Sequence, residues 1–203
     1  GSFSTVSASS CTECTAGLAD LDLDASTACT ECEVGTYSST SSTSCGNCQS
    51  GTADLDASSA TPCEVCPIGR YSGDAASAST ECAAGSADLD SDPSTPCQAC
   101  STGTFSVGGG IMCVLCIAGR ADIDSDPSTA CVQCSVGQFA PLRSSSCIDC
   151  EAGFADPDSD PSTACSSCDV GTFSGPRAIV CEPCVSGTAD LDGSAATSCD
   201  QCP

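Results

Sequence analysis

The sequence predicts an elongated array of small disulfide-rich modules, built from short strands and turns with almost no helix and little conventional core. Cys-x-x-Cys pairs open at alternating steps of 18 and 16 residues, a 34-residue period. A fixed period of this size is typical of repeat arrays in which each unit packs against its neighbours. Leu, Ile, Val and Phe together number only 29 of 203 residues, and the net charge is -23. Such a composition cannot fill an ordinary core, so cross-links must supply the order.

The period divides the chain into repeats that each join an 18-residue long unit to a 16-residue short unit. The predicted boundaries are a truncated short unit at 1–10, repeats at 11–44, 45–78, 79–112, 113–146 and 147–180, and a truncated sixth repeat at 181–203. Because the sequence opens and closes inside a unit, we expect it to be a window on a longer array.

The long unit is clearest at 85–100, GSADLDSDPSTPCQAC, and its copies begin at Gly17, Gly51, Gly85, Gly119, Gly153 and Gly187. The alternation in Ala53-Asp54-Leu55-Asp56 predicts a short strand with one apolar and one acidic face. In the copy that begins at Gly85, the acidic alternation is followed by Asp92-Pro93-Ser94-Thr95, which has the residues of a type I turn.

The short unit carries an aromatic ring two residues after its glycine. The rings are Phe3, Tyr37, Tyr71, Phe105, Phe139 and Phe173. In a chain so poor in apolar residues we expect them to form a small plug between successive modules. A glycine follows every pair by three residues, which predicts a positive φ angle or a close backbone approach there. No segment has a 3.6-residue apolar stripe, so no helix is expected.

The cysteines indicate disulfides. Their spacing also satisfies a four-cysteine zinc site, but the composition is not that of a cytosolic protein, and no thioredoxin-like pattern supports a redox pair. In an oxidising compartment, closing a loop of about 15 residues stabilises a fold by about 3 kcal/mol. We therefore expect a secreted protein, located outside the cell or on its surface.

The simplest connectivity is a ladder that joins the second cysteine of each pair to the first of the next. Its bonds are Cys14–Cys29, Cys32–Cys45, Cys48–Cys63, Cys82–Cys97, Cys100–Cys113, Cys116–Cys131, Cys134–Cys147, Cys150–Cys165, Cys168–Cys181 and Cys184–Cys199. The total of 23 cysteines is odd because Ser79 stands where a pair should open. The ladder therefore leaves Cys66 as a free thiol, and the partners of Cys11 and Cys202 lie outside the sequence.

The motif Cys-x-x-Cys-x-x-Gly-x-(Phe/Tyr)-Ser, followed by the next Cys-x-x-Cys, resembles the cysteine-rich repeats of the ephrin-receptor-like group, relatives of tumour-necrosis-factor-receptor and EGF-like modules. The resemblance covers the whole chain. The acidic variant, with its Asp-Pro-Ser-Thr turn, is similar to long arrays in secreted surface proteins of algae and other protists. It implies a disulfide-laddered rod outside the cell, and such modules serve both receptors and passive stalks. Some similar receptor modules cross their bonds, here Cys11–Cys29 with Cys14–Cys32, so both connectivities stay open.

The acidic runs suggest calcium as the one candidate cofactor, because their spacing matches the first three ligands of an EF-hand loop. The candidate ligands are Asp20, Asp22, Asp24, Asp88, Asp90, Asp92, Asp122, Asp124, Asp126, Asp156, Asp158 and Asp160. The glycine and glutamate that complete such a loop are missing, so a solvated acidic face is the alternative. O-linked glycans are the available sugar attachment, with Thr61 and Thr95, each followed by proline, as candidate sites of a glycoprotein.

The composition argues against several functions. Four Arg, no Lys and no His argue against nucleic acid and anionic membranes as partners, and the most apolar run, 108–119, is too short to span a bilayer. We expect neither a signal peptide nor a membrane segment in this sequence. Every carboxylate cluster is repeated, whereas catalysis needs one distinct constellation, so we expect no enzyme and no required cofactor.

The sequence therefore predicts a structural extracellular protein that self-associates to form or extend a surface filament, such as a flagellar hair, glycofibril or matrix strand. The alternative is the ligand-binding ectodomain stalk of a receptor or adhesin. That alternative needs a module that departs from the others, and the irregular segments 108–112 and 140–143 are the candidates.

Overall fold

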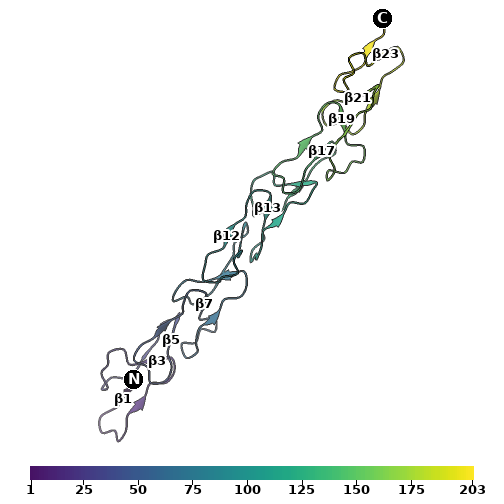
Figure 1. Ribbon diagram of the computed structural model, residues 1–203. Helices are drawn as coiled ribbons and strands as arrows, with labels where there is room; N and C mark the ends of the chain where they lie inside the picture. Colours follow the sequence, from purple (N-terminus) through teal and green to yellow (C-terminus); the bar gives the residue numbers. More distant parts are fainter. The chain divides into compact units, whose positions relative to one another are not determined.

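A computed structural model describes all residues, Gly1–Pro203. It contains no helix, and hence none long and apolar enough to cross a membrane. Each odd-numbered strand pairs with the next even-numbered strand to form a two-stranded sheet, and these small hairpins follow one another along the chain (Figure 1). The predicted fold class, disulfide-rich modules of short strands and turns with almost no helix and little core, is confirmed.

All strands are two residues long. They are β1 (Ser2–Phe3), β2 (Thr12–Glu13), β3 (Leu18–Ala19), β4 (Thr30–Glu31), β5 (Thr36–Tyr37), β6 (Gly46–Asn47), β7 (Thr52–Ala53), β8 (Glu64–Val65), β9 (Arg70–Tyr71), β10 (Thr80–Glu81), β11 (Ser86–Ala87), β12 (Gln98–Ala99), β13 (Thr104–Phe105), β14 (Val114–Leu115), β15 (Arg120–Ala121), β16 (Val132–Gln133), β17 (Gln138–Phe139), β18 (Ile148–Asp149), β19 (Phe154–Ala155), β20 (Ser166–Ser167), β21 (Thr172–Phe173), β22 (Glu182–Pro183), β23 (Thr188–Ala189) and β24 (Asp200–Gln201).

Each hairpin joins the residues after a repeat glycine to the two residues inside the next Cys-x-x-Cys pair. In the hairpin of β7 and β8, Thr52 lies opposite Val65 and Ala53 opposite Glu64. The repeat glycines have positive φ, as predicted; Gly35, for example, has a φ of 82°. A side chain on Gly35 would also collide with the carbonyl oxygen of Ala75. Glycine is therefore required there both for its backbone angle and for its lack of a Cβ.

The chain forms two compact units. Unit 1 comprises Gly1–Gln98 and Gly108–Met112, and unit 2 comprises Ala99–Val107 and Cys113–Pro203. In both units, the residue after each aromatic ring donates its N–H to a carbonyl 21 residues later, as Ser38 does to Ser59 (3.0 Å) and Ser174 to Ala195 (3.0 Å). Within each unit, neighbouring modules are thus joined by backbone hydrogen bonds at fixed sequence offsets.

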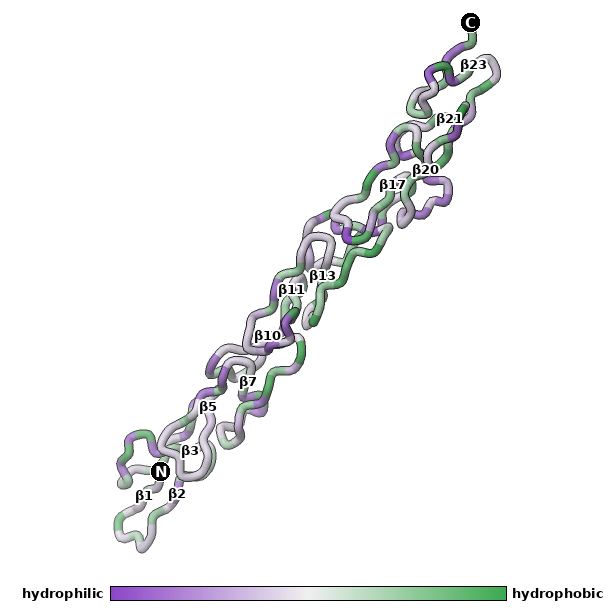
Figure 2. Tube along the Cα trace, viewed as in Figure 1, coloured by the Kyte–Doolittle hydropathy of each residue, from purple (hydrophilic) through white to green (hydrophobic).

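The buried side chains are mainly those of cysteine, alanine, serine and the first aspartate of the long unit, as at Asp54. Figure 2 accordingly shows hydrophilic and hydrophobic segments alternating along the chain. The expected plug of aromatic rings was wrong, because all six rings are only half-buried. A buried serine follows four of the six rings instead, and Ser72 is 3 % exposed. The N–H of Ser72 donates to the carbonyl of Pro93, its own carbonyl accepts the N–H of Gly51, and its hydroxyl donates to the carbonyl of Thr52 (2.9 Å). The small serine side chain therefore allows three segments to pack closely together.

The long-unit strand is shorter than expected. β7 ends at the fully buried Ala53, and the next residue, Asp54, is buried while Leu55 is 40 % exposed. The prediction that leucine forms the apolar face of this strand was therefore wrong. The carboxylate of Asp54 accepts the N–H of Ser58 (2.9 Å), so a hydrogen-bonded acid takes the inner position and the leucine faces solvent.

The ten disulfides join the same pairs as the ladder connectivity, and no crossed bond occurs. They are Cys14–Cys29, Cys32–Cys45, Cys48–Cys63, Cys82–Cys97, Cys100–Cys113, Cys116–Cys131, Cys134–Cys147, Cys150–Cys165, Cys168–Cys181 and Cys184–Cys199. Long units close over a separation of 15 residues and short units over 13. Each of these ten loops thus has one covalent closure.

One module lacks its closure. Cys66 is free and buried, whereas the other two free cysteines, Cys11 and Cys202, are exposed. The Sγ of Cys66 lies 3.2 Å from the Oγ of Ser72. The side chain of Arg70 donates to the carbonyl of Ser79 (3.2 Å), the residue at the partner position, and forms an ion pair with Glu81 (2.9 Å). Polar contacts therefore replace the disulfide in this short unit.

We predict that Ser79→Cys forms a bond with Cys66, because residues 66 and 79 have the 13-residue separation of the Cys32–Cys45 bond. The number of free thiols should fall from three to two. Amide hydrogen exchange of residues 67–81 should slow, with an added local stability of about 2–4 kcal/mol.

The double variant Cys66→Ser, Ser79→Cys is the control, since it carries the new residue but cannot close the loop. A count of four free thiols in Ser79→Cys would contradict the prediction, and the control should have three.

Candidate functional site

The most frequently repeated polar feature is the acidic turn, which we define as residues 20–27, 54–61, 88–95, 122–129, 156–163 and 190–197. Its first aspartate has a structural role. Asp122 and Asp156 are buried, and their carboxylates accept the N–H groups of Gly103 (3.2 Å) and Gly137 (3.0 Å), the glycines of the preceding short units. Buried carboxylates are tolerated when they are hydrogen-bonded in this way.

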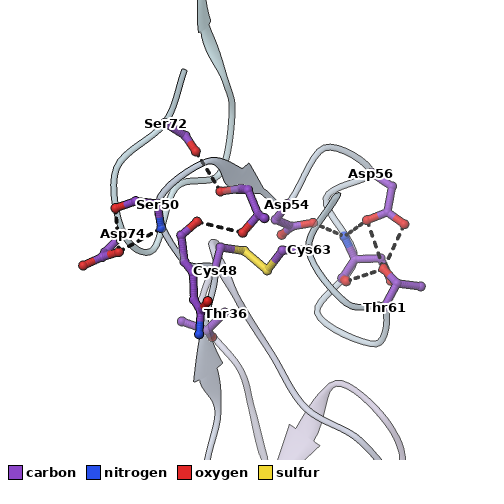
Figure 3. The surroundings of a disulfide bond; sticks show 12 residues. Thr36, Cys48, Ser50, Asp54, Asp56, Thr61, Cys63, Ser72 and Asp74 are labelled. Carbon is purple, nitrogen blue, oxygen red and sulfur yellow. Dashed lines mark hydrogen bonds between the residues drawn. A yellow bond between two sulfur atoms is a disulfide. The ribbon is translucent and has the colours of Figure 1, made fainter. Parts of the chain in front are cut away.

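The second aspartate of the turn binds the turn's threonine. The Asp56 carboxylate accepts the hydroxyl of Thr61 at 2.9 and 3.1 Å and the N–H of Ser58 at 3.0 Å (Figure 3). The Thr61 hydroxyl is the main cause of a lowered pKa at Asp56. At Asp22 the N–H of Asp24 is the main cause, followed by the hydroxyl of Thr27. These donors favour the charged carboxylate.

Four of the six turns have a third aspartate, and it accepts hydrogen bonds from the serine two residues later. Asp92 accepts the hydroxyl of Ser94 (2.7 Å) and its N–H (2.9 Å), and both lower the pKa of Asp92. The N–H of Thr95 donates to the carbonyl of Asp92 (3.1 Å), which closes the turn predicted at 92–95. The acidic turn is therefore held by its own side chains in their anionic form.

The three aspartates of a triplet accept hydrogen bonds from different donors, as Asp122, Asp124 and Asp126 do. No group of three or more His, Cys, Asp or Glu side chains is placed to hold a metal ion. Calcium binding by the triplets predicted from the sequence stays a prediction.

The two candidate glycosylation sites lie in acidic turns. The hydroxyl of Thr61 donates to Asp56, and that of Thr95 donates to Asp90 (3.0 Å). A sugar on either oxygen would remove the hydrogen that the carboxylate accepts. Glycosylation at these two residues stays a prediction, and it would cost the turn these contacts.

Three of the six aromatic rings line shallow grooves at equivalent places in the repeat. Each groove is formed by a ring, the residues of the next Cys-x-x-Cys pair and the start of the following long-unit strand. We call them the Tyr37 groove, the Phe105 groove and the Phe139 groove; their volumes are about 230, 290 and 210 Å3. These grooves were not predicted from the sequence, although the apolar residues 9, 10 and 12 positions after Phe105 were a usable signal.

No protein-family model matches the chain, and a search of curated proteins finds no match. The resemblance to ephrin-receptor-like and related modules therefore stays an interpretation of the cysteine motif.

We predict that Thr61→Val raises the pKa of Asp56, because it removes the hydroxyl that contributes most to lowering that pKa. An NMR titration of the Asp56 carboxyl measures the change. Thr52→Val is the matched control in the same module, since the Thr52 hydroxyl donates to the carbonyl of Gln49 and to no carboxylate. An Asp56 pKa that is the same in both variants would contradict the assignment.

We also predict that the acidic turns loosen in acid. The folded pKa values of their second aspartates lie below 3.8, so the unfolded chain takes up protons first as the pH falls. The stabilisation is complete well above pH 3.8 and is lost as the pH falls through the folded values. Hydrogen exchange of the Thr61 amide at about pH 2.5 and pH 6 tests this. Asp56→Asn removes the titrating group, so its turn should show a smaller pH response than the unchanged chain.

Proposed function

We propose that the chain is a structural extracellular protein whose disulfide-linked modules self-associate to form or extend a surface filament, such as a flagellar hair, glycofibril or matrix strand. The ten disulfides indicate a non-cytosolic protein, because cytosolic thiols are kept reduced. The single observation that carries the filament proposal is regularity. Every long unit and every short unit makes the same backbone contacts to the next at the same offsets.

Regularity supports a structural role for a physical reason. A binding or catalytic site requires one arrangement that differs from its surroundings. The acidic turn occurs six times, and in each copy the hydroxyl of its threonine donates to its second aspartate, from Thr27 with Asp22 to Thr197 with Asp192. A surface that repeats in this way offers the same contacts at regular intervals, which suits association into an extended assembly.

The receptor or adhesin stalk is the second candidate, and one observation favours it. The surface around the Phe105 groove departs from the repeat, since Val114, Leu115 and Ile117 occupy positions held by Gly46, Asn47 and Gln49 two periods earlier. A single deviating surface of this kind suits a specific partner.

We predict that the purified oxidised protein forms fibres in negative-stain electron microscopy. Reduction under mild conditions should abolish them, because each module loses the closure that orders it. Isolated particles at every concentration tested, with all ten disulfides intact, would contradict the filament proposal.

A further inference from the structure

The Phe105 groove lies in the least acidic part of the chain. Between Asp92 and Asp122 there is no Asp or Glu, although the chain contains 27 of them. The groove belongs to unit 2 and is lined by Phe105, Val114, Leu115, Ile117 and Arg120 among others. Val114, Leu115 and Ile117 are 47, 40 and 60 % exposed. In Figure 2 the longest hydrophobic segment lies beside the β13 label.

Arg120 has no carboxylate partner. The structure contains two ion pairs, and neither involves Arg120: Arg70 pairs with Glu81 and Arg177 with Asp149. The Arg120 guanidinium donates only to the carbonyl of Cys131 (3.2 Å). A chain with a net charge of -23 thus keeps an unpaired cation at the edge of an exposed apolar groove.

The two equivalent grooves lack this combination. The Tyr37 groove is lined by polar residues such as Asn47, Gln49 and Thr52 and has no cation. The Phe139 groove is apolar but carries carboxylates, Asp149 and Glu151. Only the Phe105 groove combines an apolar surface with a positive charge and no negative one.

The chain also displays the complementary surface. In five of the six acidic turns an exposed leucine or isoleucine stands between two aspartates. The exposed fractions are 51 % for Leu21, 40 % for Leu55, 48 % for Leu89, 55 % for Ile123 and 60 % for Leu191. The aspartate that follows each of them is exposed and anionic, as Asp22 and Asp192 are. An apolar side chain beside a carboxylate matches an apolar groove beside a guanidinium.

We propose that the Phe105 groove binds an acidic turn of a second copy of this chain. The leucine of the turn packs against Val114, Leu115 and Ile117, and the aspartate after it pairs with Arg120. This inference rests on the proposed function and specifies it, because it assigns a lateral contact through which two copies associate.

Ionic strength weakens the repulsion between two copies of the chain more than it weakens the contact between Arg120 and an aspartate. Copies with a net charge of -23 repel one another over long distances, and this repulsion is screened at a Debye length of about 8 Å in 0.15 M salt. The pairing of Arg120 with an aspartate acts at contact and is partly sheltered by the apolar residues around it. Association should therefore be stronger at about 0.15 M than at about 0.01 M salt.

Sedimentation velocity of the full chain at about 0.15 M salt, together with electron microscopy of the same samples, tests the inference. The double variant Leu115→Asn, Ile117→Gln installs the residues that the Tyr37 groove carries at these positions, and Arg120→Thr installs its Thr52. We expect lateral association to weaken about tenfold in the double variant and several-fold in Arg120→Thr. Val65→Gln is the matched control: Val65 is 69 % exposed outside the grooves, and Gln133 stands at its equivalent position.

A second variant tests the occupant. Changing Leu21, Leu55, Leu89 and Leu191 to serine removes all four leucines that stand between the first and second aspartates of a turn, keeps Ile123 and leaves the groove unchanged. It should weaken lateral association as much as the groove variant does.

Three results would overturn the inference. If wild-type fibres are single and the groove variants sediment as the wild type does, the filament proposal stands and the lateral contact is wrong. If the groove variants dissociate but the leucine variant does not, the groove binds a different partner surface. If the wild type forms neither fibres nor laterally associated species, the proposed function fails together with the inference.

Discussion

The disulfide between consecutive Cys-x-x-Cys pairs is the constraint on which the other contacts depend. A pair of two-residue strands is not stable by itself in water, and here no larger sheet and almost no apolar core supports it. Closing each loop over 13 or 15 residues reduces the conformational freedom of the unfolded chain and brings the next pair alongside. The hairpins, the glycine turns and the cross-module hydrogen bonds then form between segments that are already close.

Small buried side chains follow from this arrangement. Where Ser72 meets Thr52 and Pro93, backbone groups of three segments exchange hydrogen bonds, so a large side chain would separate them. The aromatic ring one residue earlier, Tyr71, is only half-buried, and the equivalent ring Tyr37 lines a groove. The Cys66 module shows the same arrangement without its covalent closure, because Arg70 and Ser79 hold the loop by polar contacts.

The acidity of the chain has two distinct consequences. The aspartates of the acidic turns act locally as hydrogen-bond acceptors, and their lowered pKa values keep them charged in all but strongly acidic solution. Collectively they give the chain a charge of -23, which keeps copies apart unless a specific contact overcomes it. The segment 93–121, which contains no Asp or Glu and ends next to Arg120, differs from the rest of the chain in this respect.

The sequence by itself determined the spacing of the hairpins, the positive φ of glycines such as Gly35 and the absence of helix. All of these depend on local spacing or on the chemistry of single residues. The spacing of the cysteines was compatible with both the ladder and the crossed connectivity. The positions of the sulfur atoms in the structure, as in the Cys14–Cys29 bond, select the ladder. Only the tertiary structure decided that Asp54 lies inward while Leu55 faces solvent, that serine rather than the ring is buried, and that Arg120 lies beside Phe105 without a carboxylate partner. These outcomes depend on which segments meet across modules, and residue order along one strand does not specify that.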